Sequence, residues 1–486
     1  MSRALEGLNP ERVFYYFEEI SKIPRCSGDE KRISDYLASL GRELGLETIQ
    51  DEALNVIIKK PGTKGYENSP TVVLQGHMDM VCEKDENVVH DFSKDPIRLI
   101  VDGDYIKADG TTLGADNGIA VAMALAVLES KDIPHPPLEV LITSDEEAGM
   151  NGAKRLDPSN IRGKILINID SEEEGTVLVS CAGGQRNLVT ILISWETLKE
   201  EGKAYLLKTK GLQGGHSGSD IDKGRGNANK IITRILAFAK DECDIRLAKI
   251  EGGSKANAIP RNASAVVVVK DKDEESFLQA VGYLKEQIKK ELKYGDPDFE
   301  LEVTALDERI ERVFSKDSFN KVIAALTLIP NGVQTMSSEI EGLVESSNNM
   351  AVVITHEDKV TIECALRSSV ASLKENIAMK IKAVSEIVNG EYEKSGDYPA
   401  WEFKKESKIR EIFQKVYKEM FGKELKVEAI HAGLECGLFD EKFGGTLDMI
   451  SFGPNMYNVH SPQEKLSITS TQNTYNLLLN VLKEIK

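Results

Sequence analysis

Six acidic or imidazole side chains follow apolar runs of the chain or stand at the start of an apolar helix. They are His77, Asp79, Asp116, Glu146, Glu147 and Asp170. In an open α/β sheet, ligands bind beyond the carboxyl ends of the strands, so these side chains converge if the strands are parallel. Carboxylates crowded in a cleft raise each other's pKa values, and bound divalent cations relieve that repulsion. The pattern predicts a metal site, with ligand types that suit zinc.

A second histidine ligand has few candidates, because the chain has only seven histidines. His460 is the best of them, since it opens a loop that follows the apolar run 449–452. Each residue alone has an ordinary explanation: Asp is common in turns, and Glu146 with Glu147 fits a solvated surface pair. Because several such sites coincide, we favour metal chemistry.

The apolar runs predict the elements that position these residues. Most are continuous rather than alternating, which is typical of strands buried on both faces of an α/β sheet. The expected strands lie at 55–59, 71–75, 138–143 and 164–169. The run 119–129 predicts a helix that crosses over between two of them.

After about residue 184, strand-like stretches alternate with amphipathic helices. We therefore expect an α/β fold with two domains. A catalytic metal-binding domain, with a mixed sheet flanked by helices, is formed by 1–186 and 396–486. An inserted α+β lid at 187–395 binds substrate and is long enough for two small units of about 100 residues each.

The composition excludes several classes of protein. The net charge of −18 argues against nucleic acid as a partner, because phosphate backbones need neutralisation by Lys and Arg. The longest apolar run, 118–128, is far shorter than the ~20 residues that span a bilayer, so we expect no membrane association. The first twenty residues lack the pattern of a secretory signal. Six scattered cysteines without a CxxC pair predict reduced thiols and a cytoplasmic location.

Five motifs in chain order resemble those of the two-zinc metallopeptidases of the aminoacylase and glutamate-carboxypeptidase type. They are Gly76-His77-Met78-Asp79, Gly114-Ala115-Asp116-Asn117-Gly118, Asp145-Glu146-Glu147-Ala148-Gly149, Asp170 and His460-Ser461-Pro462. Three further stretches resemble the aminoacyl-histidine dipeptidase branch of this family: 23–27, 211–218 and 433–437. The resemblance covers essentially the whole chain.

The resemblance implies a role for each residue of these motifs. His77 and Asp170 would bind one zinc ion, Glu147 and His460 the other, and Asp116 would bridge both. A cis peptide bond is expected after Asp116. Cobalt or manganese could substitute for zinc, since both accept nitrogen and oxygen ligands.

Two further acids have catalytic roles by the same resemblance. Asp79 would orient the His77 imidazole from behind. Glu146 would be the general base that takes a proton from water and passes it to the leaving amine. Adjacent residues on extended backbone point in opposite directions, so we expect one base and one ligand from the pair Glu146 and Glu147.

Four residues are candidates for binding the substrate. His216, in a glycine-rich loop, would sit over the scissile carbonyl by resemblance, in cis or from a partner subunit. Arg367 is the candidate cation for the free carboxylate of a peptide, although without the resemblance a solvated strand end explains it better. Asn257 would add a hydrogen bond, and Gly433 could offer its backbone at close range.

The sequence thus predicts zinc-dependent hydrolysis of short peptides, above all Xaa-His and other unblocked dipeptides. Related alternatives are an amidohydrolase of N-acyl amino acids and a tripeptidase. A non-catalytic peptide-binding module is disfavoured because Glu146 and all five ligands are present, and a two-metal phosphoesterase would want more basic residues near the metals. The lid permits a monomer or a homodimer, and we lean toward the homodimer.

Overall fold

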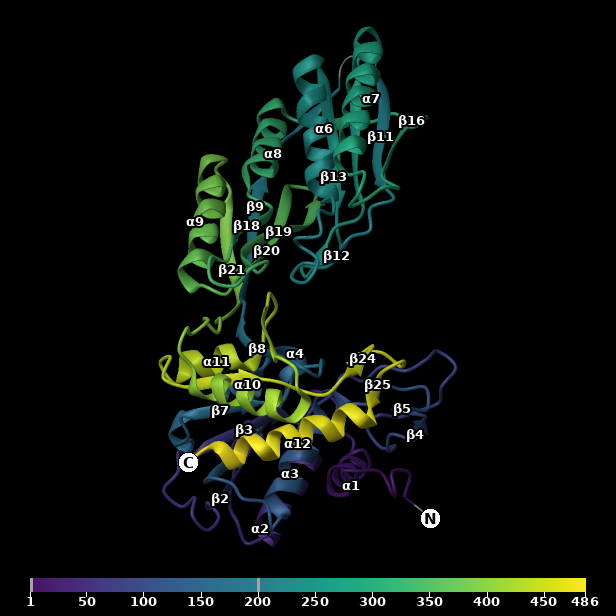
Figure 1. Ribbon diagram of the computed structural model, residues 1–486. Helices are drawn as coiled ribbons and strands as arrows, with labels where there is room; N and C mark the ends of the chain where they lie inside the picture. The colour runs from purple at the N-terminus through teal and green to yellow at the C-terminus, as the bar shows by residue number, and fades with distance from the viewer. Residues whose placement is uncertain (1–2, 199–201) are drawn as a thin grey trace. The chain divides into compact units, whose positions relative to one another are not determined.

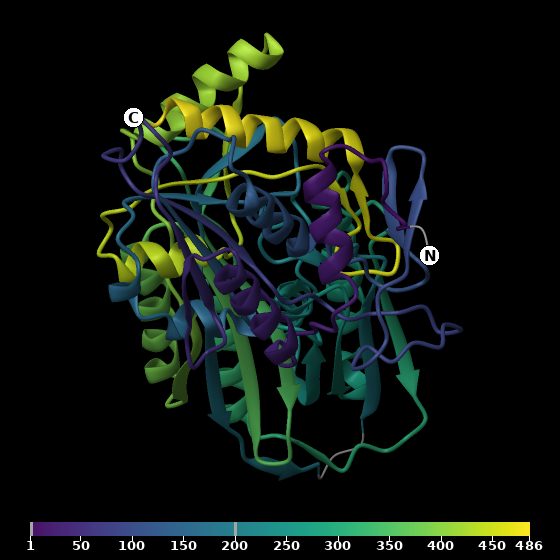
Figure 2. The ribbon, with the colours of Figure 1, turned by 90° about the horizontal axis from the view of Figure 1, so that it is seen from below.

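The computed structural model describes residues 3–198 and 202–486, which form two compact units. Unit 1 is built from Met1–Ser180, Phe403–Ala429 and Leu434–Lys486, and unit 2 from Cys181–Glu402 and Ile430–Gly433. The purple N-terminal and yellow C-terminal segments therefore belong to the same unit (Figures 1 and 2). The short segment 430–433, which we expected in the first domain, joins unit 2. There the Ala182 N–H donates to the carbonyls of Ile430 (3.1 Å) and Ala432 (3.0 Å).

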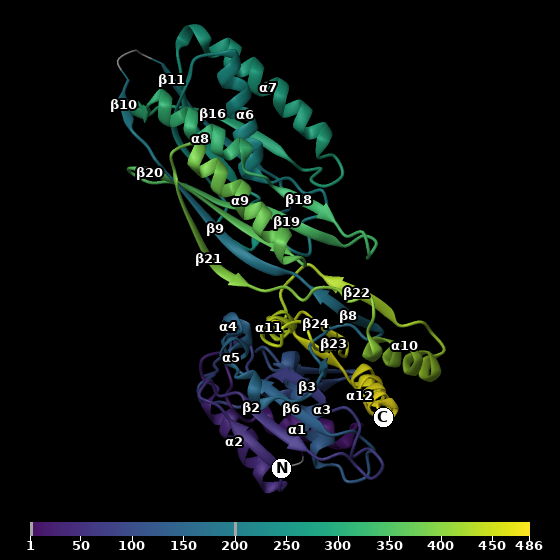
Figure 3. The same ribbon diagram turned by 90° about the vertical axis from the view of Figure 1, so that its left-hand side faces the viewer.

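An eight-stranded mixed sheet is the framework of unit 1 (Figure 3). In sheet order the strands are β1 (Glu47–Gln50), β2 (Val56–Lys60), β6 (Leu138–Thr143), β3 (Val72–His77), β7 (Ile165–Asn168), β23 (Asp448–Ser451), β8 (Thr176–Cys181) and β22 (Lys426–Ile430). Strand β3 runs parallel to β6 and β7, and β7 parallel to β23. Strands β3 and β6 are buried at every position, as their continuous apolar runs predicted. Their carboxyl ends therefore meet at one edge of the sheet.

Helices flank this sheet, and their sequences explain where each is placed. They are α1 (Glu11–Ile20), α2 (Lys31–Glu43), α3 (Ala115–Glu129), α4 (Glu146–Gly149), α5 (Asn151–Arg155), α10 (Lys408–Phe421), α11 (Glu435–Lys442) and α12 (Ile468–Glu484). Helix α3 is apolar on all sides and is buried at nearly every position, so it is a core helix. The element starts at Ala115, but Asp116 (φ −78°, ψ 108°) and Asn117 (φ −114°, ψ 29°) are not helical, so the regular turns follow Asn117, close to the predicted start at residue 119.

A small antiparallel sheet completes unit 1. Its strands in order are β24 (Met456–Tyr457), β25 (Lys465–Ser467), β5 (Tyr105–Ala108) and β4 (Leu99–Asp102). The hairpin formed by β24 and β25 presents His460 in its connecting loop. Because β25 pairs with β5, this late hairpin is fixed to a segment that directly precedes α3 in the chain.

Unit 2 contains a nine-stranded antiparallel sheet made of two similar halves. The first half is β11 (Lys203–Lys210), α6 (Ala228–Glu242), β13 (Ile245–Gly252), β15 (Ala263–Val269), α7 (Glu274–Glu291) and β16 (Glu300–Leu306). The second half is β9 (Gly183–Leu192), α8 (Lys316–Leu328), β19 (Val344–Thr355), β20 (Lys359–Ser368), α9 (Ala371–Ile387) and β21 (Glu391–Tyr398), and β18 (Gly332–Met336) pairs with β19. Each half has the order strand, helix, strand, strand, helix, strand.

The two halves of unit 2 join edge to edge through β13 and β19. Helices α6, α7, α8 and α9 cover one face of the sheet (Figure 3). Burial alternates along β15 and β20, as expected for a sheet with only one face packed against helices. The small pairs β10 (Trp195–Thr197) with β17 (Arg312–Phe314), and β12 (Gly215–His216) with β14 (Ala258–Ile259), lie outside this sheet.

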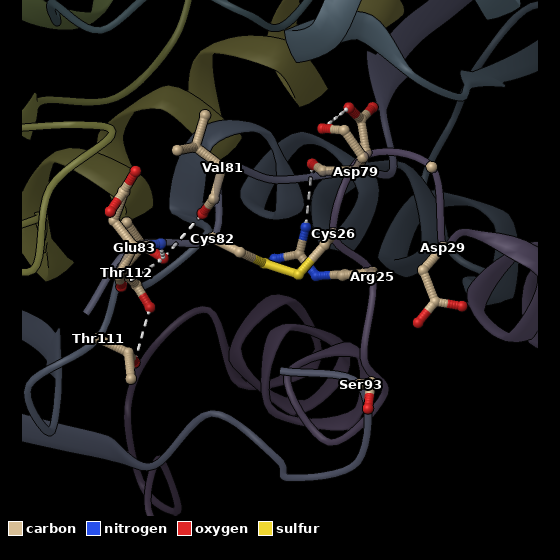
Figure 4. The surroundings of a disulfide bond; sticks show 12 residues. Arg25, Cys26, Asp29, Asp79, Val81, Cys82, Glu83, Ser93, Thr111 and Thr112 are labelled. Carbon is tan, nitrogen blue, oxygen red and sulfur yellow. Dashed lines mark hydrogen bonds between the residues drawn. A yellow bond between two sulfur atoms is a disulfide. The ribbon is translucent and has the colours of Figure 1, made fainter. Parts of the chain in front are cut away.

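The cysteines differ from the sequence prediction at two positions. Cys26 and Cys82 form a disulfide, so the expectation of six reduced thiols is wrong for this pair (Figure 4). The two cysteines are 56 residues apart in the chain, so no local sequence pattern indicates that they are close in space. The Arg25 guanidinium brings the two loops together by donating to the carbonyls of Met78 (3.0 Å) and Asp79 (3.3 Å). The other four cysteines are thiols.

Among the residues that the structure describes, no helix combines the length and apolar character required to cross a bilayer.

Candidate metal centre

Three ligand-type side chains meet at the carboxyl edge of the parallel strands in unit 1. His77 is the last residue of β3, Asp170 follows β7 by two residues, and Asp116 lies at the start of α3. The His77 Nε2 atom is 3.2 Å from Asp116 Oδ1 and 3.5 Å from Asp170 Oδ1. All three donor atoms lie within 4.8 Å of one another, which is compatible with one metal ion between them.

A second group of three shares Asp116 with the first. His460 Nε2 is 3.1 Å from Asp116 Oδ2 and 3.0 Å from Glu147 Oε1. One carboxylate oxygen of Asp116 thus faces His77 and the other faces His460. This arrangement can hold two cations with Asp116 between them.

The backbone around Asp116 has the cis peptide bond to Asn117 that the resemblance implied. The Asn117 side chain accepts from the His77 N–H at 3.2 Å and donates to the Ile169 carbonyl at 2.7 Å. A Cβ atom at Gly76 would lie 2.4 Å from Asn117 Oδ1, so only glycine fits there. These contacts join the ends of β3 and β7 to the start of α3.

Asp79 is fully buried and lies on the opposite side of the His77 ring from Asp116. His77 Nδ1 is 3.5 Å from Asp79 Oδ1 and 3.2 Å from the Asp79 carbonyl. The same carboxylate accepts from the backbone N–H groups of Glu146 (3.0 Å) and Glu147 (3.2 Å). Asp79 therefore fixes both the imidazole and the backbone that carries the two glutamates.

Glu146 and Glu147 do not lie on extended backbone, and that part of the sequence argument was wrong. After β6 the chain turns at Asp145, whose φ of 51° is left-handed, and Glu146 begins the short helix α4. Side chains of neighbouring helical residues diverge by about a third of a turn, so the two carboxylates still separate. Glu147 lies in the group with His460, whereas both glutamates lie near His77.

The carboxylates crowd each other strongly at this centre. Burial raises the pKa of Glu146 well above its ordinary value, and the charges of Asp170 and Glu147 add to the shift. Burial likewise raises the pKa of Asp170 to about 6. Hydrogen bonds that the His460 ring donates to the carboxylates of Asp116 and Glu147 raise the pKa of His460 to about 11. The cluster therefore favours bound positive charge.

The donor set fits a pair of divalent metal ions. Each group combines one imidazole nitrogen with carboxylate oxygens, which are the ligand types of zinc and similar metals. Burial first, and then repulsion between the acids, raises the pKa values of Glu146 and Asp170, and bound cations would offset both effects.

A cationic cluster in unit 2 contains the residues expected to bind substrate. Arg367, at the end of β20, lies with Nη2 3.4 Å from His216 Nε2 and donates to the Tyr398 hydroxyl at 3.2 Å. The backbone N–H groups of Gly218 and Ser219 point at His216 Nδ1 (3.3 Å each), and the Arg367 guanidinium, which can only donate, faces Nε2, so donors face both ring nitrogens. Burial and then Arg367 lower the pKa of His216, so the ring is neutral.

The other two candidates lie around this cluster. The Asn257 side chain is exposed, and its carbonyl accepts from the Ser217 N–H at 2.8 Å. Gly433 lies in the segment 430–433, two residues after the buried His431. The Nε2 atom of His431 hydrogen-bonds the Ser347 hydroxyl at 2.7 Å. All four predicted residues are thus in unit 2, whereas the seven residues predicted for metal binding and catalysis are in unit 1.

Sequence reasoning missed the side chains that support the metal-ligating loops. Arg25 is fully buried and also donates to the Gly114 carbonyl at 2.5 Å. Two residues before His77 on β3, Gln75 donates to the buried Glu435 carboxylate (2.6 Å) and accepts from Asn168 (2.6 Å). Gln75 is two residues before His77, and Asn168 two before Asp170, so the strand period of two was the available signal.

The fold and this centre define a class of protein. Residues 73–484 match the model of peptidase family M20/M25/M40, and the chain belongs to that family. Peptidases of this family depend on metal ions, typically a pair.

Several relatives match nearly the whole chain. It is 39% identical over 483 residues to the cytosol non-specific dipeptidase of Escherichia coli (strain K12), covering 99% of each. The crystal structure of aminoacylhistidine dipeptidase from Vibrio alginolyticus superposes with a TM-score of 0.94 at 42% identity, covering 99% of this chain and 98% of that one. An aminopeptidase from Bacillus cereus, at 17% identity and a TM-score of 0.57, covers 98% of this chain and 99% of its own, and shares the fold.

Proposed function

We propose that the protein is a two-metal dipeptidase that hydrolyses unblocked dipeptides, including those that end in histidine. The observation that carries this proposal is the position of Asp116, one oxygen of which faces His77 and the other His460. Glu146, which belongs to neither of these two groups, lies near His77. The two relatives that match nearly the whole chain at 39% and 42% identity are dipeptidases by name. We further propose zinc as the native metal and a cytoplasmic location, the latter because the Escherichia coli relative is named as a cytosol enzyme.

His77 and Asp170 would hold one ion, Glu147 and His460 the other, and Asp116 both. The chemistry that such a pair supplies is polarisation of the scissile carbonyl and a lower pKa for water. Glu146, buried with a raised pKa, is suited to take a proton from the attacking water and return it to the leaving amine. Asp79 keeps Glu146 in place through its backbone N–H.

Unit 2 would act as the substrate-binding lid. When its Nε2 atom carries the hydrogen, His216 would donate to the carbonyl oxygen as negative charge develops. Arg367 would bind the free carboxylate of the dipeptide, because a guanidinium forms strong charge-assisted hydrogen bonds with a carboxylate. Asn257 would add a side-chain hydrogen bond, and Gly433 a backbone contact.

The doubled architecture of unit 2 supports a monomer as readily as a homodimer. Its two halves already pair edge to edge within one chain. His216 comes from the first half and Arg367 from the second, so one chain holds both groups. Light scattering of the purified protein would decide between the two states, and mixing inactive His216 and Glu146 variants would reveal any action of His216 across subunits.

A substrate panel tests the proposed activity. It contains Xaa-His dipeptides, other dipeptides, tripeptides and N-acetyl amino acids, each assayed with and without a chelator. We expect chelator-sensitive cleavage of the unblocked dipeptides. Cleavage confined to N-acetyl amino acids or tripeptides would replace the proposed substrate class, and no hydrolysis with zinc, cobalt or manganese would favour a peptide-binding module.

A further inference from the structure

The Glu464 carboxylate binds four consecutive backbone N–H groups at the start of α3. Its Oε2 atom accepts from Leu113 (2.7 Å) and Gly114 (3.0 Å), and Oε1 accepts from Ala115 (2.8 Å) and Asp116 (3.4 Å). The side chain is only 2% exposed. These N–H groups lie just before the regular turns of α3, because Asp116 and Asn117 are not helical, and the carboxylate satisfies donors that would otherwise be buried without a partner.

This carboxylate connects two loops that each carry a proposed metal ligand. Glu464 lies four residues after His460, in a turn closed by its own N–H donating to the Ser461 carbonyl at 3.0 Å. The loop that it binds ends at Asp116, which lies 3.1 Å from His460. Glu464 thus links the two loops directly, in addition to the pairing of β25 with β5 that holds the hairpin.

The backbone segment around Gly114, which donates to Glu464, is also bound by Arg25. The Gly114 N–H donates to Glu464, and the Gly114 carbonyl accepts from Arg25. A Cβ atom at Gly114 would lie 2.5 Å from the Arg25 guanidinium, and its φ of 69° is left-handed. The loop before Asp116 thus has one conformation, set by two buried charges of opposite sign.

Capping alone does not require a full charge here. Ser, Thr or Asn satisfies a helix amino terminus in most proteins, whereas a second buried carboxylate close to Asp116 is repelled by it. Four hydrogen bonds offset the repulsion between the Glu464 and Asp116 carboxylates. A charged residue at this position therefore favours a role beyond satisfying the backbone N–H groups.

We propose that Glu464 is a positioning residue of the metal centre, which holds Asp116 and His460 at the separation that the second metal ion requires. This inference rests on the ligand set proposed above. Residues behind metal ligands commonly contribute about 10- to 100-fold to metal affinity.

The test compares Glu464→Gln with the matched variant Glu139→Gln. Glu139 is also a buried acid of unit 1 (3% exposed), and it accepts from the backbone N–H groups of Arg162 (2.8 Å) and Gly163 (2.9 Å) at the opposite end of β6 from Glu146. Zinc alone is titrated into each metal-free, full-length protein in competition with a fluorescent zinc indicator. We expect zinc affinity about 10- to 100-fold weaker for Glu464→Gln and within about twofold of wild type for Glu139→Gln.

Two further measurements separate positioning from folding. The unfolding temperature of the metal-free protein should fall in both Gln variants, and more in Glu464→Gln, because Glu464 accepts four backbone hydrogen bonds and Glu139 accepts two. With saturating zinc, Glu464→Gln should lower kcat and leave the KM for a dipeptide near that of wild type. If Glu464→Gln does not fold, Glu464→Asp retains the charge with shorter reach, and its zinc affinity should lie between those of wild type and His460→Ala.

His460→Ala distinguishes the ways in which the proposal can fail. We expect it to bind one zinc ion tightly rather than two. Wild-type zinc binding by His460→Ala would overturn the ligand set itself. Loss of one ion in His460→Ala together with wild-type affinity in both Glu464 variants would overturn only the role of Glu464, as would equal weakening in Glu139→Gln.

Discussion

Asp116 Oδ2 and His460 Nε2 lie 3.1 Å apart although 344 residues separate them in the chain. The contact exists because the hairpin of β24 and β25 is anchored on β5, close to the start of α3. The first and last thirds of the sequence thus build one centre. Two of the four predicted effects concern unit 1, which contains this centre, and two concern unit 2.

Replacing Glu146 by Gln should abolish proton transfer while the metal-binding groups remain. We expect kcat for a dipeptide to fall by about 10²- to 10⁴-fold, the usual contribution of a general base. Zinc content, measured by elemental analysis, should stay at the wild-type value, because Glu146 lies outside the two groups that share Asp116. A variant with wild-type kcat, or one that loses zinc, would exclude Glu146 as the base.

Replacing Arg367 by Ala should weaken recognition of the substrate carboxylate. Hydrogen bonds to charged groups contribute about 1.5–3 kcal/mol, so the KM for a dipeptide should rise about 10- to 100-fold. The KM for the same dipeptide with an amidated C-terminus should change little. Arg186→Ala is the control, because Arg186 is exposed on the neighbouring strand and pairs with Ala365. Equal effects on acid and amide would argue against carboxylate binding.

Breaking the Cys26–Cys82 disulfide should destabilise unit 1. A crosslink between residues 56 apart restricts the unfolded chain by about 4 kcal/mol in the loop-entropy model. Cys26→Ser, or a reductant, should lower the unfolding temperature, whereas Cys243→Ser should not. Alkylation of the denatured, unreduced protein followed by mass measurement should detect four thiols. Detection of six would show that the protein as isolated lacks the bond.

The stability of unit 2 should decline in mild acid because of His431. Burial, together with the charges of Arg367 and His216, lowers its pKa to about 3. An unfolded chain binds this proton below about pH 6.5, so the folded state loses stability as pH falls below that value. Between pH 7 and pH 5 the loss from this group is about 2 kcal/mol.

Denaturant unfolding at pH 7 and pH 5 measures whether the free energy of unfolding falls, and by how much. In His431→Gln the fall in the free energy of unfolding between pH 7 and pH 5 should be smaller than in wild type by that amount. The same pH dependence in both proteins would assign the acid sensitivity to other groups. The Gln side chain can retain a hydrogen bond with the Ser347 hydroxyl, which limits the structural disturbance.

Much of the fold and of the metal centre could be read from local pattern. The apolar runs that became β3, β6 and β7 identified buried strands, and the polar residues after them identified the edge where ligands gather. Strand period and residue type are properties of neighbouring residues, so a sequence displays them directly. The resemblance of five motifs to a metallopeptidase family added the assignment of ligands to two ions and the cis peptide bond.

Tertiary structure alone decided which distant groups meet. The four N–H donors of Glu464 are backbone atoms, which no residue type reveals, and Arg25 binds carbonyls on two other loops. The Cys26–Cys82 pair and the helical start of α4 were likewise missed. Each depends on how segments far apart in the chain pack, and close packing, rather than local propensity, sets those distances.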